Sequence, residues 1–256
     1  MSIMLRELRA RKPLIHCITN HVVSNFQANG LLALGVSPVM GDEQQEVAEL
    51  TGHADALSLN IGTITERSFQ SMLTAGHAAM KKGIPIVLDP VGAGATVYRL
   101  EAVKRLLTEL DVTLLRCNAG ELAAIAGADW QARGVDAGEG EGDLAVIAKQ
   151  VADEYQTIVA VTGTRDLVTD GKRTEYIAGG DPLMASVTGM GCLLSAVLAA
   201  FLTDKESGQL DAVAFGLQLY ANAGSRAAKI ALHPGAFQMS FLDELSKRQE
   251  ALVHGN

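Results

Sequence analysis

Short apolar runs alternate with longer helical segments through the first two thirds of the chain, and this alternation limits the possible folds more than any other feature. An uninterrupted apolar run such as Ile-Val-Leu at residues 86–88 is typical of a parallel strand that is covered on both faces. The predicted strands span residues 14–19, 38–40, 57–60, 84–88, 112–115 and 157–161, and the predicted helices span residues 25–34, 44–50, 66–82, 100–110, 120–126 and 143–154. The pattern predicts an α/β fold with a mostly parallel central sheet between two layers of helices.

The last third of the chain departs from this alternation. Residues 167–169 and 174–177 flank an Asp170-Gly171 turn and predict a hairpin that adds antiparallel edge strands. After residue 187 the sequence is nearly all helical in character, and the alanine and glycine content of residues 211–232 predicts a closely packed helix.

Nothing in the sequence divides the 256 residues into separate domains. An apolar content of 48% allows one sizeable core, so we expect a single domain over residues 1–256 with no separate lid domain. Residues 134–143 are acidic and rich in glycine, but their spacing does not match a calcium-binding loop. We expect this segment to be a solvated connector.

Charge, cysteine content and the length of the apolar runs limit the partners and the compartment that we expect for this chain. The net charge is -8 and the longest basic runs are pairs, which argues against a nucleic-acid partner. The three cysteines, Cys17, Cys117 and Cys192, are too widely spaced for a disulfide framework or a zinc site, and they predict a cytoplasmic chain with reduced thiols. The longest apolar run, residues 192–202, is shorter than the roughly 20 residues that cross a bilayer, so we expect no membrane association.

A glycine-rich turn leads directly into this apolar run, with the sequence V-T-G-M-G-C-L-L-S-A-V-L-A-A-F-L over residues 187–202. Gly189 and Gly191 lack side chains that would keep a ligand from the backbone, and the first turn of a helix has unpaired N–H groups that bind anions. Cys192 lies in that turn, where the helix dipole is expected to stabilise its thiolate. A tight turn before a core helix with an inert cysteine is the alternative interpretation, and the G-x-G pattern alone does not decide between them.

Small or polar residues follow each of the six predicted strands, which is where ligands bind in open α/β sheets. One such turn would be an ordinary connection, but six at one edge predict a site. The segments that follow the strands are residues 19–21, 40–42, 60–63, 89–94, 116–121 and 162–164.

Three charged residues in these segments suggest phosphate and metal chemistry. Asp89 and Glu121 are suited to hold Mg²⁺ directly or through water, although an N-cap role for Asp89 and a first-turn role for Glu121 are alternatives. Arg116 is suited to bind phosphate, with a plain ion pair as its alternative. With the turn at residues 188–192, this set indicates phosphoryl transfer, and the absence of a G-x-x-x-x-G-K-[ST] loop means that a nucleotide is held in another way.

Six segments together resemble the hydroxyethylthiazole kinase family, the thiamine-salvage enzymes with a ribokinase-like three-layer α/β/α fold. The resemblance runs in the same order from about residue 14 to residue 245. The segments are H-C-I-T-N-H-V-V-S-N-F-Q-A-N-G-L-L-A-L-G-V-S-P-V-M, N-I-G-T, I-V-L-D-P-V-G-A-G-A-T, R-C-N-A-G-E, V-T-G-T-R-D-L-V-T-D-G and T-G-M-G-C-L-L-S-A.

The resemblance implies transfer of the ATP γ-phosphate to the primary alcohol of 4-methyl-5-(2-hydroxyethyl)thiazole, with Mg²⁺ as cofactor. It places Cys192 where the larger superfamily has its catalytic aspartate. It also implies a homotrimer with active sites between subunits. By position, the substrate-binding residues are Met40 through its backbone amide, Asn20, Val22 and Gly189; the ATP-binding residues are Arg116, Thr162 and Gly191; and the metal residues are Asp89 and Glu121.

The chain departs from the family pattern at a few positions. Met190 stands in place of the usual threonine of the glycine turn and Cys117 in place of the usual glycine after Arg116. Another ribokinase-like kinase of a small alcohol such as hydroxymethylpyrimidine, or a ribokinase-like nucleotide-dependent hydratase, is an alternative. A cysteine hydrolase is a third, but it requires a histidine partner for Cys192 that no spacing suggests.

Overall fold

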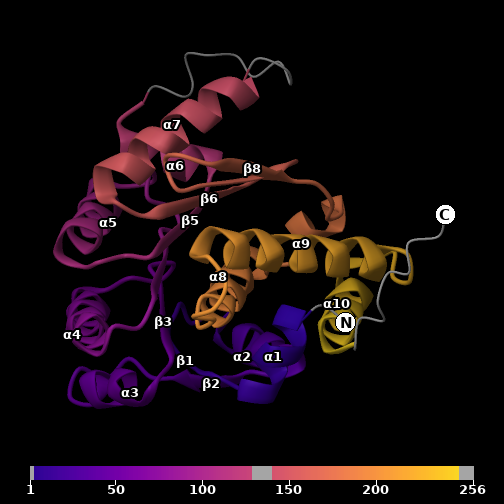
Figure 1. Ribbon diagram of the computed structural model, residues 1–256, viewed down its shortest axis with the longest axis horizontal. Helices are drawn as coiled ribbons and strands as arrows, with labels where there is room; N and C mark the ends of the chain where they lie inside the picture. The colour runs from indigo at the N-terminus through magenta and orange to yellow at the C-terminus, as the bar shows by residue number, and fades with distance from the viewer. Residues whose placement is uncertain (1–2, 129–139, 248–256) are drawn as a thin grey trace.

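The computed structural model describes residues 3–128 and 140–247 and contains one eight-stranded sheet in the order β2-β1-β3-β4-β5-β6-β7-β8 (Figure 1). The first six strands are parallel, and the last two run antiparallel as the predicted hairpin. The strands are β1 (Leu14–Ile18), β2 (Ser37–Met40), β3 (Ala56–Asn60), β4 (Ile86–Asp89), β5 (Leu114–Asn118), β6 (Ile158–Thr162), β7 (Asp166–Thr169) and β8 (Thr174–Ile177). The α/β fold and its mostly parallel sheet are confirmed.

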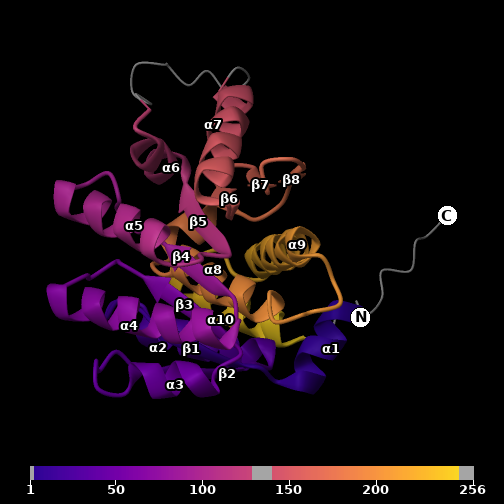
Figure 2. The ribbon, with the colours of Figure 1, turned by 60° about the vertical axis from the view of Figure 1, so that its left-hand side comes forward.

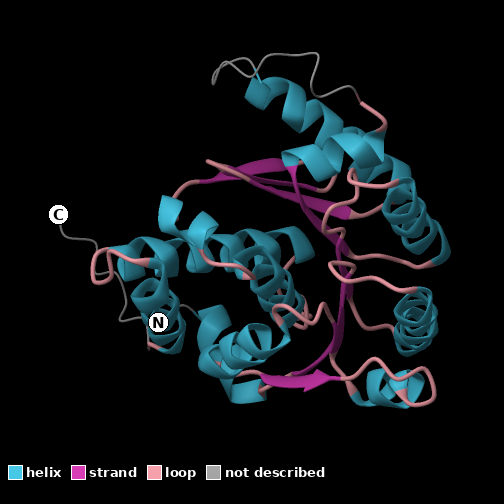
Figure 3. Ribbon diagram, turned by 180° about the vertical axis from the view of Figure 1, so that it is seen from behind, coloured by secondary structure: helices cyan, strands magenta, loops and turns pink. Residues whose placement is uncertain are grey.

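Helices cover both faces of the sheet (Figure 3). One layer contains α3 (Val47–His53), α4 (Glu66–Lys82), α5 (Val97–Glu109), α6 (Ala119–Ala126) and α7 (Gly140–Tyr155). The other contains α1 (Ile3–Arg11), α2 (Ser24–Leu34), α8 (Met190–Phe201), α9 (Gln209–Ala228) and α10 (Pro234–Ser246), with the short 3₁₀ helix η1 (Pro182–Ser186) beside them. Figure 2 shows both layers from a second direction.

Each central strand contributes to two hydrophobic cores. Successive side chains of a strand point to opposite faces, so Leu114 packs in the core with α8 while Leu115 packs in the core with α4 and α5. In β6, Ala160 packs in the core with α8 and Val159 packs in the core with α4 and α5. Burial on both faces explains why these strands read as continuous apolar runs rather than as an alternation.

Helix α8 lies at the centre of its layer, and its residues from Leu193 to Phe201 are all buried. Neighbouring helices approach it closely through glycine: a Cβ at Gly30 would lie 2.3 Å from Leu193, and one at Gly216 would lie 2.7 Å from Leu198. The predicted close packing of small-residue helices is therefore confirmed for α9. No helix in the described part of the chain is long and apolar enough to cross a membrane.

Some predicted boundaries are wrong. Strands β4, β5 and β6 extend to polar residues because their ladders continue to those positions, with Asn60 opposite Asp89 and Asn118 opposite Thr162. Helix α1 was not predicted, and α10 was predicted only through the helical character of the residues after 187, without bounds. Of the predicted connector at residues 134–143, residues 134–139 lie outside the described part of the chain, and residues 140–143 begin α7.

Candidate active site

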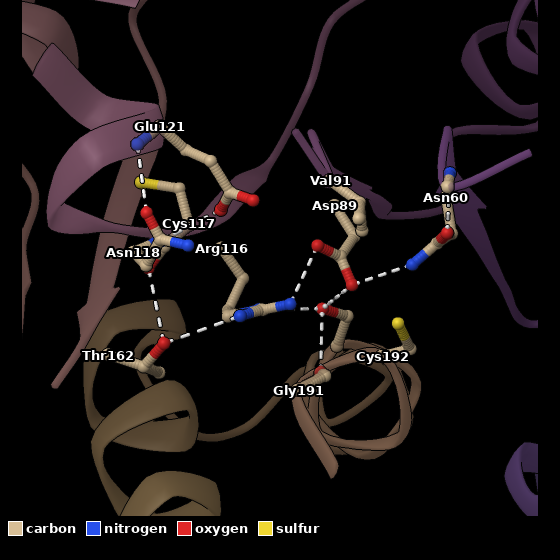
Figure 4. A network of polar contacts seen from close by, with 12 residues as sticks. Asn60, Asp89, Val91, Arg116, Cys117, Asn118, Glu121, Thr162, Gly191 and Cys192 are labelled. Atoms are coloured by element: carbon tan, nitrogen blue, oxygen red, sulfur yellow. Dashed lines mark hydrogen bonds and ion pairs between the residues drawn. The ribbon is translucent and has the colours of Figure 1, made fainter. Parts of the chain in front are cut away.

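Polar side chains from the ends of three neighbouring strands meet at one edge of the sheet, beside the first turn of α8 (Figure 4). Asn60 ends β3, Asp89 ends β4, and Arg116 lies near the end of β5. All three are buried. Parallel strands in register bring their carboxyl ends together, which explains why residues distant in sequence share one site.

Asp89 is the centre of this network and is completely buried. Its Oδ1 accepts a hydrogen bond from Arg116 Nη2 at 2.6 Å. Its Oδ2 accepts hydrogen bonds from Asn60 Nδ2 at 2.8 Å and from Ser195 Oγ at 3.0 Å. Because both oxygens are bonded within the protein, Asp89 first of all holds and neutralises Arg116.

Arg116 is charged despite its burial. Burial alone disfavours the charged guanidinium, but the carboxylate of Asp89 outweighs it and raises the pKa of Arg116 above its ordinary value. Arg116 Nε donates to Ser195 Oγ at 2.9 Å and Nη1 donates to Thr162 Oγ1 at 3.3 Å. A Cβ on Gly191 would lie 3.0 Å from both Nη atoms, so glycine at this position lets the guanidinium lie against the start of α8.

The turn before α8 has the geometry of an anion-binding helix start. Gly189 is the N-cap residue with φ +90°, a left-handed conformation that favours glycine, and it makes no side-chain cap. The first helical hydrogen bond runs from the N–H of Leu193 to the carbonyl of Gly189, so earlier N–H groups have no partner within the helix. Two positive features, the helix start and Arg116, thus adjoin each other, as a phosphate site requires.

Gly189 and Gly191 were expected to leave the backbone of the turn open to a ligand, and the structure shows a second role for both. A Cβ at Gly189 would lie 2.8 Å from Val23, and a Cβ at Gly191 would meet Arg116. Both glycines therefore allow close packing against other parts of the protein, in addition to exposing backbone N–H groups.

Cys192 lies at the end of the same network that Asn20 and Asn60 form. Asn20 Nδ2 donates to Cys192 Sγ at 3.5 Å and to Asn60 Oδ1 at 2.8 Å. The predicted stabilisation of the thiolate is wrong in net direction: burial and then the charge of Asp89 raise the pKa of Cys192, while Arg116 and the two amides only partly oppose them. The protein without ligands therefore holds Cys192 as the neutral thiol near pH 7.

Glu121 forms a capping box at the start of α6. This is the first-turn role that the sequence offered as the alternative to holding Mg²⁺. Its Oε2 accepts from the N–H of Asn118 at 2.9 Å, and Asn118 Oδ1 accepts from the N–H of Glu121 at 2.9 Å. Its Oε1 also accepts from the N–H of Gly92 at 2.9 Å, which ties the loop after β4 to α6. Glu121 is half-buried, so its carboxylate faces the site more openly than Asp89 does.

The profile of the Hydroxyethylthiazole kinase family matches residues 5–250. The chain belongs to the hydroxyethylthiazole kinase family. It is 50% identical over 246 residues to a hydroxyethylthiazole kinase of Haemophilus influenzae (strain PittEE), covering 96% of this chain and 94% of that one. It is 47% identical over 251 residues to a hydroxyethylthiazole kinase of Lysinibacillus sphaericus (strain C3-41), covering 97% and 98%.

Solved structures agree with this membership. The structure of a hydroxyethylthiazole kinase protein from Pyrococcus horikoshii OT3 superposes with a TM-score of 0.90 at 38% identity, covering 99% of this chain and 95% of that chain. A ribokinase-like superfamily protein from Enterococcus faecalis V583 has a TM-score of 0.66 at 12% identity and supports the fold alone. The predicted family and ribokinase-like fold are confirmed.

Two cavities flank the polar network in this member of the hydroxyethylthiazole kinase family. A mostly polar cavity of about 330 Å³ is lined by Thr19, His21 and Asn60, among others. A mostly apolar cavity of about 600 Å³ is lined by Thr162, Gly191 and Met190, among others. Asn60 lines the first cavity and Thr162 lines the second, so the network of Asn60, Asp89, Arg116 and Thr162 lies between the two.

The structure does not bring every predicted substrate residue into the network. Asn20 is part of it, and its Oδ1 also accepts from the N–H of Val22 at 3.1 Å. The side chain of Val22 is 67% exposed, and Met40 is half-buried at the end of β2. His16, on β1, is completely buried, and its ring nitrogens are hydrogen-bonded to Thr51 Oγ1 and to the Gly41 carbonyl.

Two residues of the polar network had no predicted role in the sequence. Asn60 was placed in one of the predicted site segments without a role of its own, and Ser195 was read as part of an apolar helix. A usable signal existed for Ser195, because it is the only hydroxyl residue between Cys192 and Leu202. A buried hydroxyl in such a helix needs a partner, and here the partners are Arg116 and Asp89.

Proposed function

We propose that the chain transfers the γ-phosphate of ATP to the hydroxyl of 4-methyl-5-(2-hydroxyethyl)thiazole, giving the thiazole phosphate used in thiamine synthesis and salvage. The observation that carries this proposal is the buried network that joins the two cavities beside the start of α8. Phosphoryl transfer depends on positioning and charge neutralisation, which such a network supplies. We also propose that the chain works as one domain in the cytoplasm, in agreement with its three free thiols.

The nucleotide is proposed to bind on the Thr162 side. Within the described chain, three of the five N–H groups of Arg116 have acceptors, so two remain for phosphate oxygens. Thr162 and the N–H of Gly191 adjoin them. The apolar wall formed by Met190 and Leu194 suits a nucleotide base.

Mg²⁺ is proposed as cofactor, and the residues fit a loosely held ion. The described residues contain no group of three or more His, Cys, Asp or Glu side chains placed to hold a metal. Mg²⁺ commonly keeps several waters and binds through one or two carboxylates and the phosphates of its nucleotide. Glu121 is the more exposed of the two proposed carboxylates, whereas Asp89 is completely buried, so Glu121 is better placed to reach a hydrated ion. When bound, the ion would neutralise charge on the β- and γ-phosphates.

The acceptor alcohol is proposed to bind near Asn20 and Cys192, with Val22, Gly189 and the backbone amide of Met40 in the same site. The cavity at Asn60 is mostly polar, whereas a thiazole ring needs apolar cover. Exposed Val22 is suited to give part of that cover if a second subunit completes the site. These two observations support the proposed homotrimer with active sites between subunits.

Cys192 is proposed to position the acceptor hydroxyl rather than to remove its proton. A thiol with a raised pKa is protonated until the pH exceeds its ordinary value of about 8.5, so a thiolate base would make kcat rise about tenfold per pH unit from pH 7 to pH 8.5. We expect kcat to change less than about threefold over that range, and Cys192→Ala to retain kcat within about tenfold, because general-base catalysis is worth roughly 10² to 10⁴. Steady-state kinetics of both proteins across this range are the measurement. A kcat that rises with pH in the natural protein and not in Cys192→Ala would show a base.

Thiazole-dependent release of ADP tests the proposed function. We expect ADP release from ATP and Mg²⁺ only when 4-methyl-5-(2-hydroxyethyl)thiazole is present, with the phosphate on its hydroxyl by mass spectrometry. 4-Methyl-5-vinylthiazole, which lacks the hydroxyl, is the matched control and should give none. Faster turnover with hydroxymethylpyrimidine than with the thiazole alcohol would show that the pyrimidine alcohol is the acceptor instead. If neither alcohol caused ADP release, the proposal would be rejected.

A further inference from the structure

Two different groups hold one edge of the Arg116 guanidinium. Nε donates to Ser195 Oγ at 2.9 Å, and Nη2 donates to Asp89 Oδ1 at 2.6 Å. In a guanidinium, Nε–H and one N–H of Nη2 point the same way, and a carboxylate that binds both forms a two-bond fork. Here the hydroxyl of Ser195 occupies the place of the second carboxylate oxygen.

Ser195 is also bonded to the carboxylate itself. Its hydroxyl lies 3.0 Å from Asp89 Oδ2 and 3.4 Å from the Gly191 carbonyl, and the residue is completely buried. One hydroxyl thus accepts from the cation and donates to the anion of the same pair. Without it, Arg116 Nε and one hydrogen-bonding site of Asp89 Oδ2 would lose their partner in a buried site, which is unfavourable. The two groups would relieve this by rotating into a fork.

We propose that Ser195 is a positioning residue that keeps the Arg116–Asp89 pair singly bonded, so that the other edge of the guanidinium, formed by Nη1 and Nη2, stays directed at the nucleotide phosphates. That edge lies at the first turn of α8, because a Cβ on Gly191 would be 3.0 Å from both Nη atoms. Rotation into a fork with Asp89 would turn this edge away from the helix start. The proposal rests on the phosphate-binding role of Arg116 proposed above.

Removing the hydroxyl tests this role. Ser195→Ala is expected to weaken ATP binding about tenfold, the usual effect of losing a hydrogen bond to a charged group. The dissociation constants of ATP and of ADP are measured by calorimetry with and without Mg²⁺, and KM and kcat follow from the kinase assay. KM for the thiazole alcohol is expected to stay within about twofold, since the described hydrogen bonds of Ser195 go to Arg116, Asp89 and Gly191 and none goes to Asn20 or Cys192.

Ser71→Ala is the matched control. Ser71 is also completely buried in a helix, and its hydroxyl bonds to the carbonyl four residues earlier, that of Arg67. The Ser71→Ala protein loses the same hydroxyl oxygen but keeps every hydrogen bond of the polar network, so nucleotide binding should not change. If Ser195→Ala does not fold, Ser195→Cys removes the hydroxyl with less change of shape, and the same weakening is expected.

A double-mutant cycle with Arg116→Ala separates positioning from a merely structural effect. When the guanidinium is absent, Ser195→Ala should change the ADP dissociation constant by less than about twofold. Independent, additive effects of the two substitutions would overturn the proposal, as would a Ser195→Ala protein that binds ATP as tightly as the natural one. Nucleotide binding needs no thiazole turnover, so these outcomes stand whether or not the proposed acceptor proves right.

Discussion

Asp89→Ala is expected to lower the free energy of unfolding by about 3 to 5 kcal/mol, the usual result of breaking a buried ion pair from one side. The side chains of Asp89 and Arg116 are 0% and 7% exposed, so solvent cannot replace the lost carboxylate. Asn60 Nδ2 and the Ser195 hydroxyl would also lose an acceptor. Urea denaturation at pH 7 measures the change.

An exposed ion pair gives the control for this experiment. Arg105 and Glu109 form a pair at 2.9 Å on the surface of α5, and Glu109→Ala should cost less than about 1 kcal/mol. The double variant Asp89→Leu with Arg116→Met should recover much of the lost stability, because an apolar pair removes the uncompensated charge. A loss below about 1 kcal/mol for Asp89→Ala would mean that the pair is not buried as described.

Most of the fold was predictable from the sequence, because strands buried on both faces leave an unmistakable pattern. The apolar runs that end at Asn60 and before Asp89 fix two neighbouring strands, and α4 was predicted with its observed bounds. The ends of β4, β5 and β6 were not predicted to the residue. Whether a polar residue such as Asn118 continues a strand depends on its neighbour Thr162 in the ladder, and the sequence alone does not show that neighbour.

The location of the site was also predictable, but its internal pairing was not. Carboxyl strand ends gave the right edge, and Asp89, Arg116 and Thr162 are all there. The sequence could not show that Arg116 bonds to Asp89 rather than to Glu121, because the two carboxylates follow neighbouring strands. It also could not show the direction of the Cys192 pKa, because that pKa is raised by burial and by the charge of Asp89, and the sequence shows neither the burial of Cys192 nor its distance from Asp89.

Replacing Arg116 separates two roles of the polar network, its contribution to stability and its contribution to catalysis. A buried ion pair is often no more stabilising than a well-packed apolar pair, so its presence at a strand end favours a functional reason. Arg116 is the member that lies against the helix start and bonds to Thr162, which lines the larger cavity. Its replacement should therefore affect phosphoryl transfer more than the loss of a single hydrogen bond would.

Arg116→Ala is expected to lower kcat/KM for ATP by about 10² to 10³, the usual effect of removing one group that stabilises charge in the transition state. Arg116→Lys should retain part of the activity, because lysine keeps the positive charge but cannot bind Ser195, Asp89 and phosphate at once in a planar arrangement. Steady-state kinetics with ATP varied at saturating thiazole alcohol are the measurement. Circular dichroism at the assay temperature shows that each variant is folded.

Arg105→Ala is the control for loss of a cation away from the site, since Arg105 pairs with Glu109 and lies over the ring of Phe69 on the surface of α5. It should leave kcat/KM unchanged. If folded Arg116→Ala kept kcat/KM within about tenfold, phosphate stabilisation by Arg116 would be untenable, because a group aimed at the reacting phosphate is worth more than that. The helix start of α8 and the proposed Mg²⁺ would then have to provide the charge neutralisation, and the Arg116–Asp89 pair would be a structural feature of the strand ends.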